Sequence, residues 1–474
     1  MKPRDYDVAI IGSGVAGIAA ANKIADSHLR VLLLDENLHP GGQILRSLPG
    51  SMETQKAQRF DPLKKTGHAI IDHLKGQRIT LMNRAKVLGI YDGRELLVEE
   101  VEKRVFTVRP RAILFATGAR ERFLPFKGWT LPGVFSTGAV QILIKGSGVL
   151  PAREILIGGS GLFLFTVACE LLENRGRVLA VLDQGSMVRK VPSLRLFLYH
   201  IPKFTEGARY LGRLMLSRVP LRHGTTILEA RGERSLQEVV TARLNRDGHV
   251  LEGSERVYKT PALAIGYGFV PNIELPQLAG CALTYEGNLG GWIVKVTEAL
   301  ETTVENIFAA GEVTGIGGAR KSLIEGYISA ISIVQKLGKG VEKSCLSRLK
   351  EERRKHLCFG WYFNALCKLP NHVLASAPEE TVVCRCEDVT LGDIKKAISE
   401  GHDTPGAIKK ALRVGMGNCQ GRTCAPVLYD ILSVYTRRPA RGIPPLSVRT
   451  PVKPVSISTL VDRVSPGCRL AEPS

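Results

Sequence analysis

Four of the ten cysteines lie in two close pairs near the C-terminal end of the sequence. Cys384 and Cys386 form a C-x-C pair, and Cys419 and Cys424 form a C-x4-C pair 32 residues further on. Four thiolates on two converging loops bind iron in a [2Fe-2S] cluster, and zinc binds comparable sets. The C-x-C spacing is uncommon in structural zinc sites, and nearby glycines free backbone N–H groups to donate to the sulfurs. The spacing favours a [2Fe-2S] cluster, with zinc as the alternative.

The N-terminus carries a glycine motif with the spacing of a nucleotide-binding turn. A strand at residues 7–11 precedes G-x-G-x-x-G, and a helix at 18–25 and a strand at 30–34 follow. Gly12 makes the tight turn, Gly14 lets a pyrophosphate approach the backbone, and Gly17 lets the helix pack on the strand. The helix N-terminus attracts phosphate, and Asp35 accepts hydrogen bonds from ribose hydroxyls. These elements together predict a dinucleotide site.

Further segments resemble the FAD site of flavoproteins that contain two dinucleotide-binding domains. The resemblance rests on the Gly-Gly-Gln turn after the acid, on the Ala-Thr-Gly strand end at 116–118, and on the segment 306–312. It implies that FAD is the dinucleotide and that Glu312, where the family usually has Asp, contacts the ribityl chain. The remaining cofactor-binding residues expected from it are Glu36, Gly42, Gln43, Val87 (through its backbone, to the adenine), Thr117, Gly118 and Gly311.

A second, imperfect copy of the motif begins at residue 154. Gly159 and Gly161 match the first two glycines, and Asp183 stands where a ribose acid is expected, but Leu164 replaces the third glycine. A leucine there pushes the helix from the strand and narrows the room for a pyrophosphate. Two interpretations stay open: a site for NAD or an adenine nucleotide, favoured over NADP because no Arg follows Asp183, and a scaffold without nucleotide.

The first unit lacks the cysteine pair of a disulfide reductase. No cysteine precedes Cys169, which lies alone in an apolar helical stretch and is expected to pack in the core. Electrons must therefore leave the flavin by a route other than a redox disulfide.

The whole pattern resembles the α subunits of amino-acid-oxidising flavoenzyme complexes, such as dye-linked L-proline dehydrogenase, opine oxidase and hydrogen cyanide synthase. The segment from Val383 to Pro426 resembles their BFD-like [2Fe-2S] domain, named after bacterioferritin-associated ferredoxin. The resemblance implies an amino-acid-oxidase-like flavoprotein β subunit that oxidises the substrate, a small additional subunit in some members, and a quinone or other electron acceptor.

Length and composition agree with a multidomain α/β protein. The chain has 474 residues, 49 of them glycine, and a formal net charge of +20. The expected fold is α/β, with two Rossmann-like domains, one inserted in the other, and a small helical cluster domain. The expected boundaries are 1–120 and 265–335 for the FAD domain, 121–264 for the second nucleotide domain, 336–380 for a helical linker, 381–436 for the cluster domain and 437–474 for a Pro- and Arg-rich tail.

Charge and hydropathy limit the classes of binding partner and the location that we expect. No nucleic-acid recognition motif accompanies the positive charge, and no apolar run of 18 residues is present, so the expected location is the cytoplasm. A basic segment with apolar side chains at 189–222 favours either a solvated helix or a surface for a partner or for the inner face of the membrane.

Three functions are consistent with these motifs. The first is the electron-transfer subunit of an amine or amino-acid dehydrogenase of the proline, hydroxyproline, opine or glycine type. The second is a self-sufficient NAD(P)H oxidoreductase that passes electrons to its own cluster. The third is a structural or regulatory subunit that holds zinc.

Overall fold

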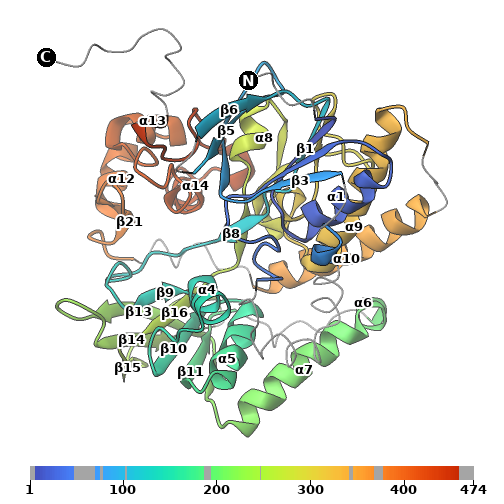
Figure 1. Ribbon diagram of the computed structural model, residues 1–474. Helices are drawn as coiled ribbons and strands as arrows, with labels where there is room; N and C mark the ends of the chain where they lie inside the picture. The colour runs from blue at the N-terminus through green and yellow to red at the C-terminus, as the bar shows by residue number, and fades with distance from the viewer. Residues whose placement is uncertain are drawn as a thin grey trace, which may run out of the picture.

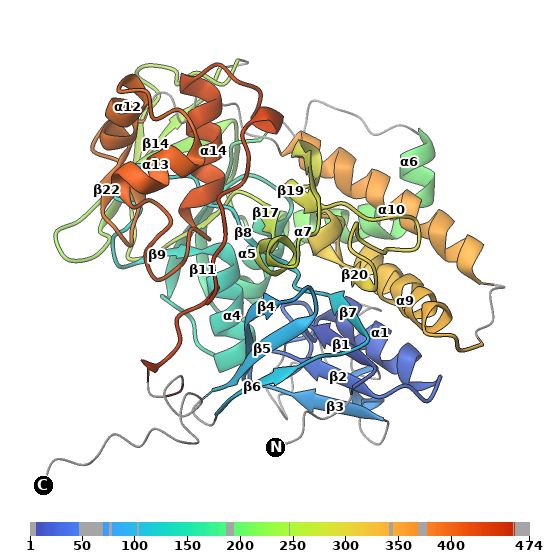
Figure 2. The same cartoon turned by 90° about the horizontal axis from the view of Figure 1, so that it is seen from above.

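The computed structural model describes residues 6–46, 70–74, 78–101, 104–185, 194–245, 247–340, 345–367, 377–457 and 459. Two α/β units and a smaller helical domain pack together, with the cluster domain, drawn in orange and red, on one side (Figures 1 and 2). The predicted fold class is confirmed.

The first unit is built on a parallel five-stranded sheet with the order β20-β7-β1-β2-β3. Its strands are short and apolar, because both faces of the sheet are covered. Val8 and Ile10 point to helices α1 and α9, whereas Ala9 and Ile11 point to a three-stranded antiparallel sheet. The elements are β1 (Val8–Ile11), α1 (Val15–Ala25), β2 (Val31–Leu34), β3 (Ile79–Met82), β4 (Ala85–Tyr91), β5 (Glu95–Glu100), β6 (Arg104–Val108), β7 (Ala112–Phe115), β20 (Ile307–Ala309) and α9 (Ala319–Lys336).

The second unit repeats this architecture. Its parallel sheet has the order β12-β11-β10-β16-β9, with helices on one face and the antiparallel sheet β13-β14-β15 on the other. The elements are β9 (Val134–Ser136), α4 (Thr137–Ser147), β10 (Glu154–Gly159), α5 (Phe163–Glu173), β11 (Arg177–Asp183), α6 (Leu194–Tyr199), α7 (Ile201–Leu216), β12 (Leu221–His223), β13 (Thr225–Arg231), β14 (Glu238–Arg243), β15 (Arg256–Lys259) and β16 (Leu263–Gly266).

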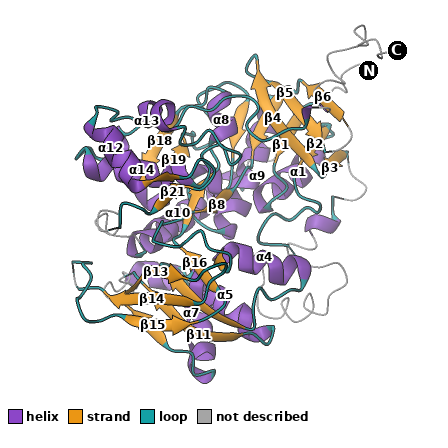
Figure 3. Ribbon diagram, turned by 90° about the vertical axis from the view of Figure 1, so that its left-hand side faces the viewer, coloured by secondary structure: helices purple, strands orange, loops and turns teal. Residues whose placement is uncertain are grey.

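Two antiparallel strands connect the units. Strand β8 (Ala119–Glu121) leads out of the first unit, and β17 (Phe269–Pro271) leads back and pairs with it. The hairpin β18 (Leu283–Glu286) and β19 (Gly291–Val294) and the short helix α8 (Glu274–Leu278) follow. The second unit is therefore inserted in the first, and the two connections form one antiparallel ribbon. Figure 3 shows the second unit below the first.

Helix α10 (Leu346–Leu366) joins the first unit to the cluster domain. That domain contains β21 (Val382–Cys384), β22 (Val389–Thr390), α12 (Leu391–Ser399), α13 (Pro405–Leu412) and α14 (Cys424–Tyr435). Thr390 and Asp393 form a capping box that fixes the start of α12, and Thr404 caps α13.

Two observations bear on contact with a membrane. Within the described chain, no helix is long and apolar enough to cross a bilayer. Helices α6 and α7 expose several apolar side chains, among them Leu198, Met215 and Leu216. Residues 189–193 of the basic segment lie outside the described residues.

Candidate functional site

The first glycine turn is open where a pyrophosphate would lie. A Cβ on Gly12 would come 2.3 Å from the carbonyl oxygen of Ala116, and one on Gly17 would come 1.9 Å from that of Gly12. At Gly14, by contrast, no atom of the described residues lies within 4 Å of that position, and no described side chain caps α1. Two glycines thus pack the turn, and the third exposes the helix N-terminus to an anion. The residues present fit a dinucleotide.

The two acids after β2 have different environments. The Asp35 carboxylate accepts hydrogen bonds from the backbone N–H and hydroxyl of Ser13, both at 2.6 Å. It also accepts from the N–H and side-chain amide of Asn37, both at 2.8 Å. Asp35 is 6% exposed, whereas the Glu36 side chain is 48% exposed and forms an ion pair with Lys453. Asp35 therefore holds the turn in shape, and Glu36 is the more accessible carboxylate beside it.

Three further chain segments carry the other residues expected at the FAD site. Gly42 packs against Gly14, since a Cβ there would come 2.9 Å from the Gly14 Cα, and Gln43 beside it is exposed. Thr117 exchanges two hydrogen bonds of 2.8 Å with Asn272, and Gly118 has a φ of +67°. Val87 is buried in β4, next to the end of β2.

Glu312 makes contacts that its proposed role does not predict. Its carboxylate accepts from the N–H groups of Gly317 at 3.2 Å and Gly318 at 2.8 Å, and from the Ser322 hydroxyl at 3.1 Å. Burial raises its pKa above the usual value of a glutamate. The longer side chain thus reaches the N-terminus of α9, and a contact with a ribityl chain would compete with these bonds.

A buried ionic network that the sequence did not reveal fixes the segment around Gly311. The Lys321 ammonium donates to the carbonyl oxygens of Gly311 at 2.7 Å and Gly315 at 2.8 Å. It also lies 3.0 Å from Glu325, and neither side chain is exposed to solvent. Glu325 in turn accepts from the Gly311 N–H at 2.8 Å and pairs with Arg353 at 2.7 Å. The i, i+4 spacing of Lys321 and Glu325 is typical of solvent-exposed helices, so their spacing does not indicate burial.

The second glycine turn is covered by the end of helix α10. The Ser160 hydroxyl donates to the carbonyl oxygen of Cys367 at 2.8 Å, and the Leu162 N–H donates to the Cys367 sulfur. A Cβ on Gly161 would lie 3.6 Å from that sulfur. The thiol thus lies over the glycine that corresponds to the open Gly14.

The other residues of the second nucleotide motif also make contacts within the protein. A Cβ on Gly159 would come 1.9 Å from the Gly266 carbonyl oxygen, so this glycine packs as Gly12 does. Asp183 is 1% exposed, accepts from the Gly185 N–H at 3.1 Å and lies 3.2 Å from the His223 ring. Helix α5 starts at Phe163, two residues after Gly161, whereas α1 starts directly after Gly14. The second unit keeps the fold of a nucleotide site, and the Cys367 end of α10 lies against its glycine turn.

The four paired cysteines come together at one end of α14. The Cys424 thiol hydrogen-bonds to Cys384 and Cys419, and Cys419 also contacts Cys386. Hydrogen bonding by Cys424 lowers the pKa of Cys384 to about 6 and that of Cys419 to about 4. Thiolates of this kind are the form that binds iron.

Backbone N–H groups point at these sulfurs as expected. Gly415 donates to Cys384 and Gly421 to Cys419, and both glycines have positive φ. A Cβ on Gly417 would come 2.2 Å from the Cys386 Cβ, so the loops approach too closely for another residue there. Among the described residues no group of three or more His, Cys, Asp or Glu is arranged to hold a single ion.

The cluster domain contacts both nucleotide units. Arg120 on β8 donates to the carbonyl oxygen of Arg422 at 3.0 Å and pairs with Glu274 at 2.8 Å. Arg122 pairs with Asp430 on α14, and the Trp129 indole donates to the Val382 carbonyl oxygen at 2.7 Å. The connecting ribbon between the units is thus tied to the loop that carries Cys419 and Cys424.

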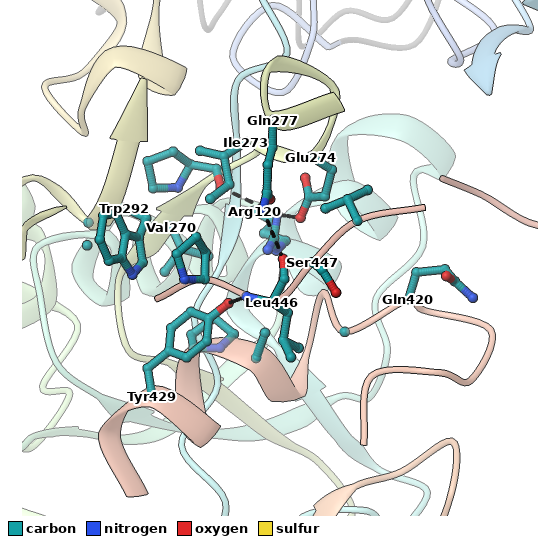
Figure 4. A pocket seen from close by; sticks show the side chains of 18 of the residues that line it. Arg120, Val270, Ile273, Glu274, Gln277, Trp292, Gln420, Tyr429, Leu446 and Ser447 are labelled. Atoms are coloured by element: carbon teal, nitrogen blue, oxygen red, sulfur yellow. Dashed lines mark hydrogen bonds and ion pairs between the residues drawn. The ribbon is translucent and has the colours of Figure 1, made fainter. Parts of the chain in front are cut away.

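A pocket lies in this same contact region. Its walls come from the ribbon, the β18–β19 hairpin, the cluster loop and the chain after α14 (Figure 4). Trp292, Gln420 and Tyr429 line it together with Arg120. The cluster loop is therefore accessible from this side of the protein.

Fold and site together define a class: a flavoprotein with two dinucleotide-binding units and a C-terminal iron–sulfur domain. The profile described as "Pyridine nucleotide-disulphide oxidoreductase" matches residues 6–332, and the one described as "BFD-like [2Fe-2S] binding domain" matches residues 382–433. The chain belongs to the pyridine nucleotide-disulphide oxidoreductase family and is an FAD-dependent oxidoreductase with a [2Fe-2S] domain. This finding favours the cluster over the zinc alternative.

Similar proteins align over nearly the whole chain. Hydrogen cyanide synthase subunit HcnB from Pseudomonas aeruginosa is 32% identical, with 95% of this chain and 97% of that protein covered. One of the opine oxidase subunits of Agrobacterium tumefaciens is 29% identical, with 96% and 91% covered. The crystal structure of L-proline dehydrogenase from P. horikoshii superposes with a TM-score of 0.71 at 21% identity, covering 97% of this chain and 80% of that chain. The predicted resemblance is thus confirmed.

Proposed function

We propose that this chain is the electron-transfer subunit of a hetero-oligomeric amine or amino-acid dehydrogenase. An amino-acid-oxidase-like flavoprotein subunit would oxidise the substrate, of the proline, hydroxyproline, opine or glycine type. Bound FAD and the cluster supply carriers that accept and release electrons, and a quinone or other acceptor would receive them. The relatives described above are subunits by name, which supports a partner subunit here.

The covered second glycine turn is the observation that carries this proposal. A self-sufficient NAD(P)H oxidoreductase needs a nicotinamide nucleotide on its second unit, with the pyrophosphate at the N-terminus of the helix. Here the Cys367 sulfur would lie 3.6 Å from a Cβ on Gly161, and the Cys367 carbonyl oxygen accepts from the Ser160 hydroxyl. This arrangement supports an electron donor other than NAD(P)H.

The docking of the cluster domain supports the same route. The bonds of Arg120 and Arg122 fix the cluster loop against the ribbon that leaves the Thr117–Gly118 end of the FAD unit. Since this contact is made by several ion pairs and hydrogen bonds within one chain, the two redox sites keep a fixed relation. The pocket beside the cluster loop gives a partner subunit or an acceptor an approach to it.

Anaerobic reduction tests the proposal. The purified chain, loaded with FAD and cluster, is mixed with NADH or NADPH, and the flavin absorbance is followed in a stopped-flow instrument. We expect no reduction within minutes, while dithionite bleaches the same sample at once. Prompt bleaching by either nucleotide would contradict the proposal.

Co-purification provides the complementary test. The tagged chain is isolated from its native host and the bound proteins are identified. We expect a flavoprotein subunit in stoichiometric amount, and reduction of this chain's flavin when a cyclic or N-substituted amino acid is added to the complex. A chain that is isolated alone and reduces a dye with NADH would support the second function instead.

A further inference from the structure

The chain beyond α14 returns to the first nucleotide unit. The backbone N–H of Leu446 donates to the Tyr429 hydroxyl at 2.7 Å, and its carbonyl oxygen accepts from the Gln277 side chain at 3.3 Å (Figure 4). The Leu446 side chain also lies against Gly415 and Gly421, where a Cβ would come 3.0 Å and 3.3 Å from it. The tail thus starts from a fixed position on the cluster loop.

Six residues further on, the tail is bound to strand β4. The Val452 N–H donates to the Leu88 carbonyl oxygen at 2.8 Å, and Val452 is 2% exposed. A Cβ on Gly89 would come 2.4 Å from the Thr450 side chain, so glycine at this position permits the approach. Figures 1 and 2 show this dark red segment running from the cluster domain to the sheet β4–β6. We define residues 446–453 as the strap.

The strap ends with Lys453 beside the two acids of the first unit. Lys453 forms an ion pair with Glu36, and its side chain is 29% exposed. Burial lowers the pKa of its ammonium group to about 8, while the charge of Asp35 favours the protonated form. The oxygens of Asp35 already accept four hydrogen bonds, so Glu36 is the direct partner of the lysine.

This position corresponds to the adenosine end of a bound dinucleotide. In a Rossmann unit the acid after the second strand binds the ribose hydroxyls. Strand β4 begins at the same point, because the Ala85 N–H donates to the Asp35 carbonyl oxygen at 2.8 Å. An ammonium group has three donors, so a lysine that pairs with Glu36 has donors left for other oxygens.

We propose that Lys453 is a ligand for the adenosine ribose of the dinucleotide, and that the strap closes this end of the site. The lysine donates to a ribose hydroxyl oxygen and orients the Glu36 carboxylate, which accepts from the ribose. This proposal depends on FAD binding by the first unit and not on the identity of the electron donor. A result that contradicts the electron-transfer function would therefore leave this proposal unaffected, and the reverse is also true.

Binding titrations of the FAD-free protein test the proposal. The variants are Lys453→Ala and, as a matched control, Lys410→Ala, since Lys410 is exposed on α13. FAD is titrated by quenching of its fluorescence, and ADP and FMN are titrated in competition. Loss of one charge-assisted hydrogen bond weakens binding about ten-fold. We expect that loss for FAD and ADP with Lys453→Ala, no change for FMN, and wild-type values for Lys410→Ala.

Two further variants distinguish a role of Lys453 in FAD binding from a role in folding. Lys453→Arg keeps the charge and should restore most of the FAD affinity. Glu36→Ala removes the ion-pair partner, and the effect of Lys453→Ala should be smaller in that background. Wild-type affinity for FAD and ADP in Lys453→Ala, together with a lower thermal midpoint, would show that the ion pair acts in stability alone and would overturn the proposal. Equal weakening of FMN and ADP would overturn it as well.

Discussion

The guanidinium of Arg120 donates to the backbone carbonyl of Arg422 over 3.0 Å, from the ribbon of the FAD unit to the loop that carries two cluster cysteines. The same guanidinium pairs with Glu274 at 2.8 Å and reaches the Asn272 side chain at 2.8 Å. Asn272 in turn holds Thr117, next to Gly118. One side chain thus links the expected flavin end of the first unit to the cluster loop.

Replacing Arg120 should slow electron transfer between the two sites more than it destabilises the protein. Arg120→Ala removes the contact to Arg422 and leaves Glu274, whose side chain is 13% exposed, without this partner. Partly buried charged hydrogen bonds contribute about 1.5–3 kcal/mol, so we expect a loss of that size in docking of the loop. Stopped-flow reduction, followed at flavin and cluster wavelengths, measures the rate between them.

Arg120→Lys serves as the control for this experiment. A lysine keeps the charge opposite Glu274 but lacks the forked donors that reach Arg422 and Asn272 together. An intermediate rate would support the link through Arg422. An unchanged rate in Arg120→Ala would show that Arg122, Asp430 and Trp129 are sufficient to dock the cluster domain.

Gly417 should be as necessary for the cluster as the cysteines themselves. Any Cβ there would come 2.2 Å from the Cys386 Cβ, so Gly417→Ala must displace the loop that carries Cys386. We expect loss of iron and of the visible cluster absorption, with FAD retained. Gly406→Ala is the matched control, since no atom of the described residues lies within 4 Å of its Cβ position. Iron analysis and absorption spectra of both variants test this prediction. A full iron complement in Gly417→Ala would show that glycine is not required there for cluster binding.

Substitutions of two glycines of the first motif should affect different properties: one should weaken FAD binding, and the other should destabilise the fold. Gly14→Ala meets open space and has an ordinary φ of −73°, so the fold should tolerate it while the pyrophosphate loses its approach. Gly17→Ala meets the Gly12 carbonyl oxygen at 1.9 Å and should lower the free energy of unfolding by about 1–3 kcal/mol. Thermal unfolding of the FAD-free proteins and FAD titration together test both statements. Equal thermal midpoints for the two variants would be inconsistent with this packing.

The features that the sequence predicted are those in which nearby residues meet. Gly12 and Gly17 lie five positions apart and touch in the structure, so their spacing alone indicates the turn. The C-x-C and C-x4-C pairs are likewise local, and one helix pair brings them together. The duplicated strand-helix-strand pattern predicted the inserted second unit for the same reason.

The features that escaped prediction depend on contacts between distant segments. Nothing in the sequence around Cys367 indicates that it lies over Gly161, and nothing around Lys453 indicates Glu36. The motif predicts that Asp35 binds the ribose, but it does not show which other groups of the protein its side chain contacts. The structure adds the contacts of Asp35 with Ser13 and Asn37, and it shows that Val452 of the C-terminal tail is buried.

Cys367 should be unreactive in the folded protein because it lies over the second glycine turn. Burial raises the pKa of its thiol to about 12, and the Ser160 and Leu162 contacts hold α10 in place. A raised pKa in the folded state stabilises the protein fully below the unfolded value of 9.0, and this contribution is lost as the pH rises from there toward about 12. Alkylation with iodoacetamide at pH 8, followed by peptide mass mapping, should modify the exposed Cys345 and Cys358 and spare Cys367. Rapid modification of Cys367 in the native protein would mean that the end of α10 leaves the turn, and the second unit would then be open to a nucleotide.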